Sequence, residues 1–216
     1  MITLTTLPWA PPFAQGLVRD LRVRWALEEA GLPYRVKLAT RDERQLPAYR
    51  ALQPFGQVPV YEDEGVTLFE SGSIVRRVAE RSEALQPRDP AGAARVLTWM
   101  FAALNSVEPA VNNLVEVDLF ARDTEWAAPR RPAVVAFLKG RLGAVASRLE
   151  GREYLEDRFS AGDLLMASVL RILRHTTIVE EMPALHAYVK RCTARPAFER
   201  ALAAQMKVFE ENAPPR

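Results

Sequence analysis

Two features that could bind a peptide-like molecule lie at the two ends of one short stretch of sequence, residues 58 to 71. At its start, Pro59 restricts Val58 to an extended backbone, and a proline in so tight a position is commonly cis. The backbone N–H and C=O of Val58 could then pair with another backbone, as a sheet edge does. At its end, the Glu70 carboxylate could bind an ammonium group while the Ser71 hydroxyl and helix amides bind a carboxylate. These groups together suit an α-amino acid head, which carries both charges.

The pattern around these residues predicts a strand, a hairpin turn, a second strand and a helix. Residues 58 to 61 alternate as in a half-buried strand, and a polar turn ends in Gly65, which tolerates positive φ. Residues 66 to 69 alternate again, after which apolar residues recur at helical spacing. A purely structural role stays open for both features, since Pro59 could merely end strand pairing and Ser71 or Ser73 could merely cap the helix.

The first 52 residues predict a β-α-β unit and a short helix. Ile2 and Leu4 alternate with threonines, a helical pattern follows up to Gly31, and residues 34 to 38 alternate again. The proline-rich loop from Trp9 to Gly16 carries aromatic side chains where a ligand could be covered. With a short helix around residues 47 to 52, this element order is thioredoxin-like, and the right-handed crossover leaves few other arrangements.

Residues 82 to 89 form a polar linker candidate, and every later segment is predicted to be helical. Asp89 is placed to cap a helix that starts at Pro90 and is interrupted near Pro109. Another helix is predicted to start at Pro132, with Gly140 and Gly143 allowing close packing, and two more start at Pro183 and Pro196. The inner side of the first of these helices is predicted to present Val96, Leu97, Met100, Phe101, Leu104 and Val107.

Ser160 and Asp163 are spaced as a capping box before a segment that is apolar on most sides. This spacing predicts a central, buried helix, and the box has a folding role of about 1 kcal/mol. We assign no catalysis to Asp163.

The overall composition excludes several classes of function. The 216 residues include 49% hydrophobic and 26% charged residues, as in an ordinary globular protein, and the net charge of +2 argues against nucleic-acid binding through a basic face. The single cysteine, Cys192, and the two separated histidines, His175 and His186, do not have metal-ligand spacing, so no metal site is expected. The sequence has no signal peptide pattern and no membrane-spanning run, which predicts a cytoplasmic protein.

Three segments resemble the cytosolic glutathione transferases: Arg22 to Tyr34, Leu52 to Pro59, and Glu70 with Ser71. In that family a valine before a cis-proline pairs with the cysteinyl backbone of glutathione, and a Glu/Gln-Ser pair holds its γ-glutamyl head. The resemblance therefore implies that Val58, Pro59, Gln57, Glu70 and Ser71 bind glutathione. It also implies an α/β plus all-α architecture, with a thioredoxin-like domain over residues 1 to 81, the linker, and an all-helical C-terminal domain over residues 90 to 216. A homodimer is likewise implied by the resemblance. The chain resembles a bacterial member of the family in which the catalytic loop is atypical.

The sequence departs from the family pattern at the group that activates the glutathione thiol. The family supplies a Tyr, Ser or Cys just after the first strand, whereas residues 8 to 20 contain none of these. The available donors are Arg19, the Trp9 indole, the Gln15 amide and the backbone amides near Gly16. Arg19 falls near the family's Ser or Cys position and could stabilise a thiolate; alternatively it is a surface residue paired with Asp20 or Glu28.

The resemblance implies an electrophile pocket between the domains, formed by Trp9, Phe13, Met100 and Leu104, with Phe209 nearby. Its aromatic and aliphatic content favours an apolar electrophile, although these residues could equally be ordinary core. The function implied is conjugation of the glutathione thiol to a small electrophile. The alternatives are a glutathione-dependent isomerase, dehalogenase or peroxidase on the same scaffold, or a non-catalytic binding or regulatory protein.

Overall fold

The structure is a computed structural model that describes residues 1 to 214. The chain divides into two compact units. The first contains Met1–Leu85 together with residues 195 to 214, and the second contains Gln86–Ala194. The predicted linker over residues 82 to 89 spans the point where the chain passes from the first unit to the second.

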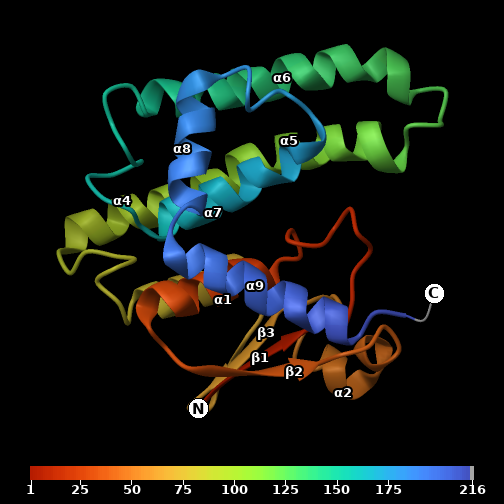
Figure 1. Cartoon of the computed structure of the whole chain (residues 1–216), viewed down its shortest axis with the longest axis vertical. Helices are drawn as coiled ribbons and strands as arrows, with labels where there is room; N and C mark the ends of the chain where they lie inside the picture. Colours follow the sequence, from red (N-terminus) through yellow and green to blue (C-terminus); the bar gives the residue numbers. More distant parts are fainter. Residues whose placement is uncertain (215–216) are drawn as a thin grey trace. The chain divides into compact units, whose positions relative to one another are not determined.

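A four-stranded sheet forms the centre of the first unit (Figure 1). Its strands are β1 (Ile2–Thr6), β2 (Tyr34–Leu38), β3 (Val60–Asp63) and β4 (Val66–Leu68), in the order β2-β1-β3-β4. β1 pairs with β2 in parallel and with β3 in antiparallel orientation, and β3 and β4 form the predicted hairpin. The thioredoxin-like order expected from the sequence is therefore confirmed.

The prediction that β3 would be half-buried from Val58 onward is wrong in two respects. The strand begins at Val60, and both Val60 and Tyr61 are fully buried. β1 is likewise buried at all five positions, although threonines alternate with its apolar residues. Both are central strands of a sheet with helices on its two faces, so alternation in side-chain type does not produce alternation in exposure.

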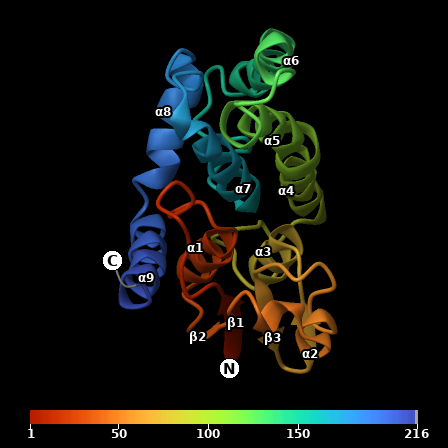
Figure 2. The same cartoon turned by 90° about the vertical axis from the view of Figure 1, so that its right-hand side faces the viewer.

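Three helices of the first unit surround the sheet: α1 (Asp20–Ala30), α2 (Pro47–Arg50) and α3 (Ser71–Ala79). Figure 2 shows α1 and α3 side by side over the strands, with α2 beyond the opposite face. A 3-10 turn at Glu43–Gln45 precedes α2. α1 ends at Gly31, whose φ of 64° is the left-handed conformation that the helix stop required.

The last helix, α9 (Pro196–Glu211), belongs to the first unit, where it packs along α1 (Figure 2). The ring of Phe198 meets the fully buried Trp25 of α1 at a centroid distance of 4.8 Å, edge to face. Phe209, near the other end of α9, is also buried. Residues more than 165 positions apart thus share one core.

The second unit consists of helices. α4 (Pro90–Phe101) continues into a π-helical segment (Ala102–Val107), which is followed by α5 (Glu108–Val115) and a second π-helical segment (Glu116–Phe120). The rest of the unit contains, in order, α6 (Ala127–Arg148), α7 (Ala161–Leu170), a 3-10 segment (Arg171–His175) and α8 (Pro183–Thr193). Asp89 caps α4 as predicted, its Oδ1 accepting a hydrogen bond from the Gly92 N–H at 2.6 Å. The interruption predicted near Pro109 takes the form of the wider π-helical turns that precede it.

Several details of the second unit differ from the sequence predictions. α6 begins at Ala127, so Pro132 does not start the helix as predicted; it lies inside the helix at the sixth position, where it cannot donate the usual backbone hydrogen bond to the Ala128 carbonyl. Phe101 is 54% exposed whereas the adjacent Met100 is buried, so the inner side of α4 is narrower than predicted. Gly140 and Gly143 have nothing within 4 Å of where a side chain would begin, so they do not provide close packing.

The capping box is present, and α7 is the central helix of its unit. The Asp163 carboxylate accepts hydrogen bonds from the Ser160 N–H and hydroxyl, each at 2.9 Å, and all ten residues of α7 are buried. The same carboxylate accepts from the Leu155 N–H at 2.9 Å and from the Tyr188 hydroxyl at 3.0 Å. Asp163 therefore ties α7 to the preceding loop and to α8, which agrees with the folding role predicted for it.

Candidate functional site

The β3–β4 hairpin brings the two predicted ligand-binding features together. The Val58–Pro59 peptide bond is cis, and Val58 is only half-buried. In the antiparallel register Tyr61 lies opposite Leu68. Because the two strands are antiparallel, the residues that lead into β3 at Val60 and those that follow β4 at Leu68 lie at the same end of the hairpin. Features that are 11 to 13 residues apart in the sequence therefore lie at the same end of the hairpin.

Glu70 occupies the N-cap position of α3 in an unusual backbone conformation. Its φ of 66° and ψ of 113° are rarely adopted by residues other than glycine, and its side chain is exposed and makes no capping hydrogen bond. The expectation that Ser71 or Ser73 caps the helix is wrong, because both residues lie inside its first turn. The first amides of α3 are thus not capped by any of these side chains.

Ser71 is 4% exposed and is held by α1. The buried Arg22 donates a hydrogen bond from Nη1 to the Ser71 Oγ at 3.4 Å. A hydroxyl group has one donor and two acceptor sites, so this contact leaves the Ser71 proton able to reach a ligand carboxylate. Arg22 also adds positive charge beside the N-terminus of α3, where the helix dipole already favours an anion.

The loop between β1 and α1 is fixed by a residue from the far end of the chain. Gln205 of α9 is fully buried; its Oε1 accepts from the Gly16 N–H at 3.1 Å. Its Nε2 donates to the Val18 carbonyl at 3.2 Å and to the buried Asp20 carboxylate at 2.7 Å. Sequence reasoning missed Gln205. The sequence did contain one indication that Gln205 is buried: it is four residues from both Ala201 and Phe209, which are buried on the same face of the helix.

The three candidates for thiol activation lie in this loop and at the start of α1. Arg19 is the exposed N-cap residue of α1, and Trp9 is half-buried. Gln15 donates from Nε2 to the Ala10 carbonyl at 2.9 Å. Of the two partners considered for Arg19, Asp20 accepts from Arg24 and Gln205, and Glu28 pairs with Arg200 at 2.7 Å. The role of each candidate stays a prediction.

Gln57, the remaining residue predicted to bind glutathione, has an exposed side chain. Its backbone carbonyl accepts a hydrogen bond from the Tyr49 hydroxyl at 2.7 Å, which anchors the segment leading to Val58. Burial raises the pKa of Tyr49, so this hydroxyl keeps its proton at neutral pH. The contact positions the backbone of Gln57 and leaves its side chain available to a ligand.

The residues predicted for the electrophile pocket are divided between the two units. Trp9 and Phe13 belong to the first unit, where Phe13 is 58% exposed and Phe209 is buried against the unit's own core. Met100 and Leu104 belong to the second, in which Met100 is buried and Leu104 half-buried. A pocket composed of these residues stays a prediction.

Residues 1 to 214 contain no cluster of three or more His, Cys, Asp or Glu side chains that could hold a metal ion. Over the same residues, no helix combines the length and apolar character needed to cross a bilayer. Cys192 is fully buried in α8, as expected for a packed thiol.

Comparison with known proteins identifies the family. Residues 21–87 match the family model of the glutathione S-transferase N-terminal domain. Over 188 residues the chain is 32% identical to glutathione S-transferase 4 of Zea mays, covering 82% of this chain and 83% of that protein. It is 30% identical over 190 residues to a maleylacetoacetate isomerase of Rhizobium meliloti, covering 83% and 89%.

The fold is also similar to solved structures. A glutathione transferase from Burkholderia graminis, with two glutathione molecules bound per subunit, superposes with a TM-score of 0.79 at 25% identity, covering 94% of this chain and 88% of that one. Because the chain is 32% identical to a glutathione S-transferase over more than four fifths of both chains, and its N-terminal part matches the family model, it belongs to the glutathione transferase family.

Proposed function

We propose that this protein binds glutathione and conjugates its thiol to a small apolar electrophile. The observation that carries the proposal is the antiparallel β3–β4 hairpin, which has the cis Val58–Pro59 bond just before β3 and Glu70 and Ser71 just after β4, at the same end. This pairing combines an extended backbone edge with the charged groups that an α-amino acid head requires.

In the proposed binding mode, the backbone of Val58 pairs with the cysteinyl unit of glutathione. The exposed Glu70 carboxylate binds the γ-glutamyl ammonium group, and the Ser71 hydroxyl with the first amides of α3 binds its carboxylate. The Gln57 side chain supplies a further polar contact. The cysteinyl sulfur would then point towards the loop before α1.

The chemical step needs a thiolate, because a free cysteine thiol has a pKa of about 8.5 and is mostly protonated at neutral pH. Each unit by which the pKa falls requires about 1.4 kcal/mol of preferential stabilisation of the anion. We assign this stabilisation to Arg19 and the N-terminal amides of α1, assisted by Trp9 and Gln15. The thiol proton passes to solvent, and the sulfur electron pair then forms the bond to the electrophilic carbon while the bond from that carbon to its leaving group breaks, and the leaving group departs with that bond's electron pair.

Titration of the thiolate absorbance of bound glutathione tests the assignment of Arg19. In Arg19→Ala the apparent pKa of the bound thiol should rise by about one unit, because an adjacent cation is lost. Arg19→Lys should restore part of the difference, and Arg41→Ala, which removes an exposed cation from another loop, should leave the curve unchanged. Superimposable curves for the wild type and Arg19→Ala, with glutathione bound in both, would exclude this role.

An assay of products distinguishes conjugation from the alternatives. A thioether product with one glutathione consumed per turnover is expected. The similarity to a maleylacetoacetate isomerase supports one rival, which would return glutathione unconsumed with a rearranged substrate. The missing hydroxyl or thiol supports a second rival, a non-catalytic binder, which glutathione would stabilise thermally without turnover of any electrophile.

The proposal includes a homodimer, as the family resemblance implied, located in the cytoplasm, as the sequence pattern predicted. Sedimentation equilibrium should give twice the chain mass of 24.2 kDa. A single species of 24.2 kDa at micromolar concentration would contradict the dimer while leaving the glutathione site untouched.

A further inference from the structure

We infer that Gln205 of α9 is a positioning residue for activation of the glutathione thiol, because it holds the backbone and the carboxylate on either side of Arg19. Its hydrogen-bond partners are Gly16, Val18 and Asp20. The last two directly flank Arg19 in the sequence. The inference rests on the proposed function, since it adds Gln205 to the step that we assigned to Arg19 and the N-terminus of α1.

The carboxamide of Gln205 can make these three contacts in only one orientation. Its Oε1 accepts from the Gly16 N–H at 3.1 Å, and its Nε2 donates to the Val18 carbonyl at 3.2 Å and to the Asp20 carboxylate at 2.7 Å. Turning the amide round would place its NH2 group against a donor and its oxygen against two acceptors. Gln205 and Asp20 are both 0% exposed, so a lost contact leaves a buried polar group unpaired. The segment that contains Arg19 is therefore fixed to α9.

Gln205 also determines where the negative charge of Asp20 lies. Asp20 is the first residue of α1, where an acidic side chain is attracted to the N-terminal amides of its helix. Here its two carboxylate oxygens accept from Gln205 and, at 2.7 Å, from the Nε of Arg24, one turn further along α1. These two donors keep the carboxylate from the N-terminal amides of α1, where its charge would oppose a thiolate.

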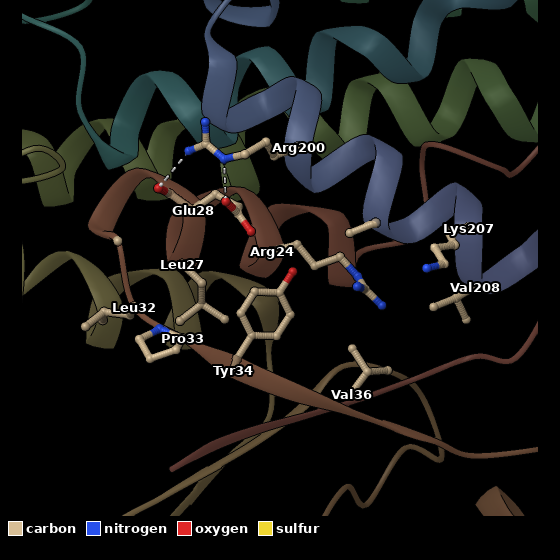
Figure 3. A pocket seen from close by; sticks show the side chains of 12 residues that line it. Arg24, Leu27, Glu28, Leu32, Pro33, Tyr34, Val36, Arg200, Lys207 and Val208 are labelled. Carbon is tan, nitrogen blue, oxygen red and sulfur yellow. Dashed lines mark hydrogen bonds and ion pairs between the residues drawn. The ribbon is translucent and has the colours of Figure 1, made fainter.

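Residues other than Gln205 anchor α9 to α1. Arg195, just before α9, pairs with Glu29 through two hydrogen bonds of 2.6 and 2.8 Å. Further along, Arg200 pairs with Glu28 at 2.7 Å, and Figure 3 shows this pair bridging the two helices. Both contacts involve the C-terminal half of α1, whereas Gln205 reaches its N-terminal end. Removal of the Gln205 carboxamide should therefore alter the loop without detaching α9.

The expected signature is a change in thiol activation with little change in glutathione binding. Without the carboxamide, residues 16 to 18 lose their fixed position and the Asp20 carboxylate loses one of its two donors, so the thiolate is less well stabilised. The residues proposed to bind the rest of glutathione, Val58, Glu70 and Ser71, are not among the hydrogen-bond partners of Gln205.

Titration of bound glutathione in Gln205→Met tests the inference, since methionine keeps the length of the side chain and suits a helix but makes none of the three hydrogen bonds. The apparent pKa of the bound thiol should rise by about 0.5 to 1 unit, which lowers the thiolate fraction about three- to tenfold. Affinity for S-methylglutathione, which has no thiol to ionise, should be almost unchanged. A thiol titration that superimposes on that of the wild type would overturn the inference.

Phe198→Leu is the matched control, because Phe198 is also buried on α9 but its ring packs against Trp25. This variant should lower the free energy of unfolding of the first unit and leave the pKa of the bound thiol at the wild-type value. An equal rise of that pKa in both variants would show that general loosening of α9 is sufficient, and it would overturn the specific role of Gln205.

Hydrogen exchange of the ligand-free protein tests the loop without relying on glutathione. In Gln205→Met the Gly16 amide should exchange at least about tenfold faster relative to the amides of β1, which report global opening. In Phe198→Leu this ratio should stay at the wild-type value. Unchanged Gly16 exchange in Gln205→Met would overturn the inference alone. A wild-type protein that binds no glutathione would instead overturn the proposed function, on which the role in thiol activation depends.

Discussion

Glu70 combines a strained backbone with a proposed contact to the ligand. At φ 66° a side chain with a Cβ atom is disfavoured, yet the residue here is glutamate and not glycine. Strained conformations of this kind persist where surrounding structure imposes them, and they concentrate at ligand sites. We propose that this strain serves to hold the exposed Glu70 carboxylate beside Ser71, at the start of α3.

Comparing Glu70→Gly with Glu70→Ala separates strain from binding. Both variants remove the carboxylate, so each should weaken glutathione binding about tenfold, as expected for loss of one charge-assisted contact. Only glycine relieves the positive φ, so Glu70→Gly should be more stable than Glu70→Ala by about 1 kcal/mol. Denaturant unfolding and calorimetry measure the two effects, and equal stabilities would show that the conformation is not strained.

Asp63 should make the stability of the first unit depend on pH. Burial opposes its ionisation, but the hydrogen bond from Tyr61 and the ion pair with Arg81 outweigh this, so the pKa of Asp63 is lowered. Because the unfolded chain then binds the proton more readily, stability is present above the unfolded pKa of about 3.9 and is lost as the pH falls towards the folded pKa. Asp63→Asn should flatten this decline.

Urea unfolding between pH 6 and pH 3 measures the effect of Asp63. Asp157→Asn is the matched control, since that side chain is 93% exposed and lies 3.9 Å from its arginine partner. A decline with pH that is equally steep in Asp63→Asn and in the wild type would contradict the assignment.

α7 shows how one helix depends on both its cap and its closest neighbour. Its capping box fixes the first turn, and its buried surface packs against α4. A side chain at Gly162, the second residue of α7, would begin 2.7 Å from the Trp99 Cβ of α4. The contact is between backbone-proximal atoms, so neither helix can yield without moving as a whole.

Gly162→Ala should destabilise the second unit by about 1 to 3 kcal/mol, the usual effect of overpacking. Gly140→Ala is the matched control, because it lies in α6 with no atom within 4 Å and should stabilise by about 0.5 to 1 kcal/mol through helix propensity. Thermal unfolding of the two variants should therefore shift in opposite directions. A shift of the same sign in both would contradict the packing argument.

α9 makes the N-terminal fold depend on the end of the chain. It buries Phe198 and Phe209 in the first unit, and its Gln205 holds the loop before α1. Burying two phenylalanine side chains contributes about 3 to 6 kcal/mol, a large part of a domain's stability. The first 85 residues alone are therefore not expected to form a stable thioredoxin-like domain.

Truncation after Ala194 tests this dependence. In a variant whose other tryptophans (Trp9, Trp99, Trp126) are phenylalanine, the emission of Trp25 should shift to longer wavelength, because the ring loses its cover by Phe198. The free energy of unfolding of the first unit should fall by about 3 to 6 kcal/mol. Truncation after Glu211, which keeps all of α9, should change neither quantity; unchanged Trp25 emission in the shorter chain would refute the role of α9.

Local sequence was sufficient to predict most helices and strands. Gly31 ends α1, Asp89 caps α4 and Ser160 with Asp163 caps α7, each where the pattern predicted. The cis Val58–Pro59 bond also occurs where the sequence predicted it. These features arise from residues a few positions apart, whose dihedral preferences and hydrogen bonds act within one turn.

Tertiary structure alone decided which faces are covered and which distant residues meet. Alternation could not show that β1 is buried on both sides, and helical spacing could not place Phe101 outside or α9 in the first unit. The contacts of Gln205 with Gly16 and Asp20 join segments separated by more than 170 residues. Burial and polar pairing depend on the partner that packs against a segment, and no periodicity within the segment specifies that partner.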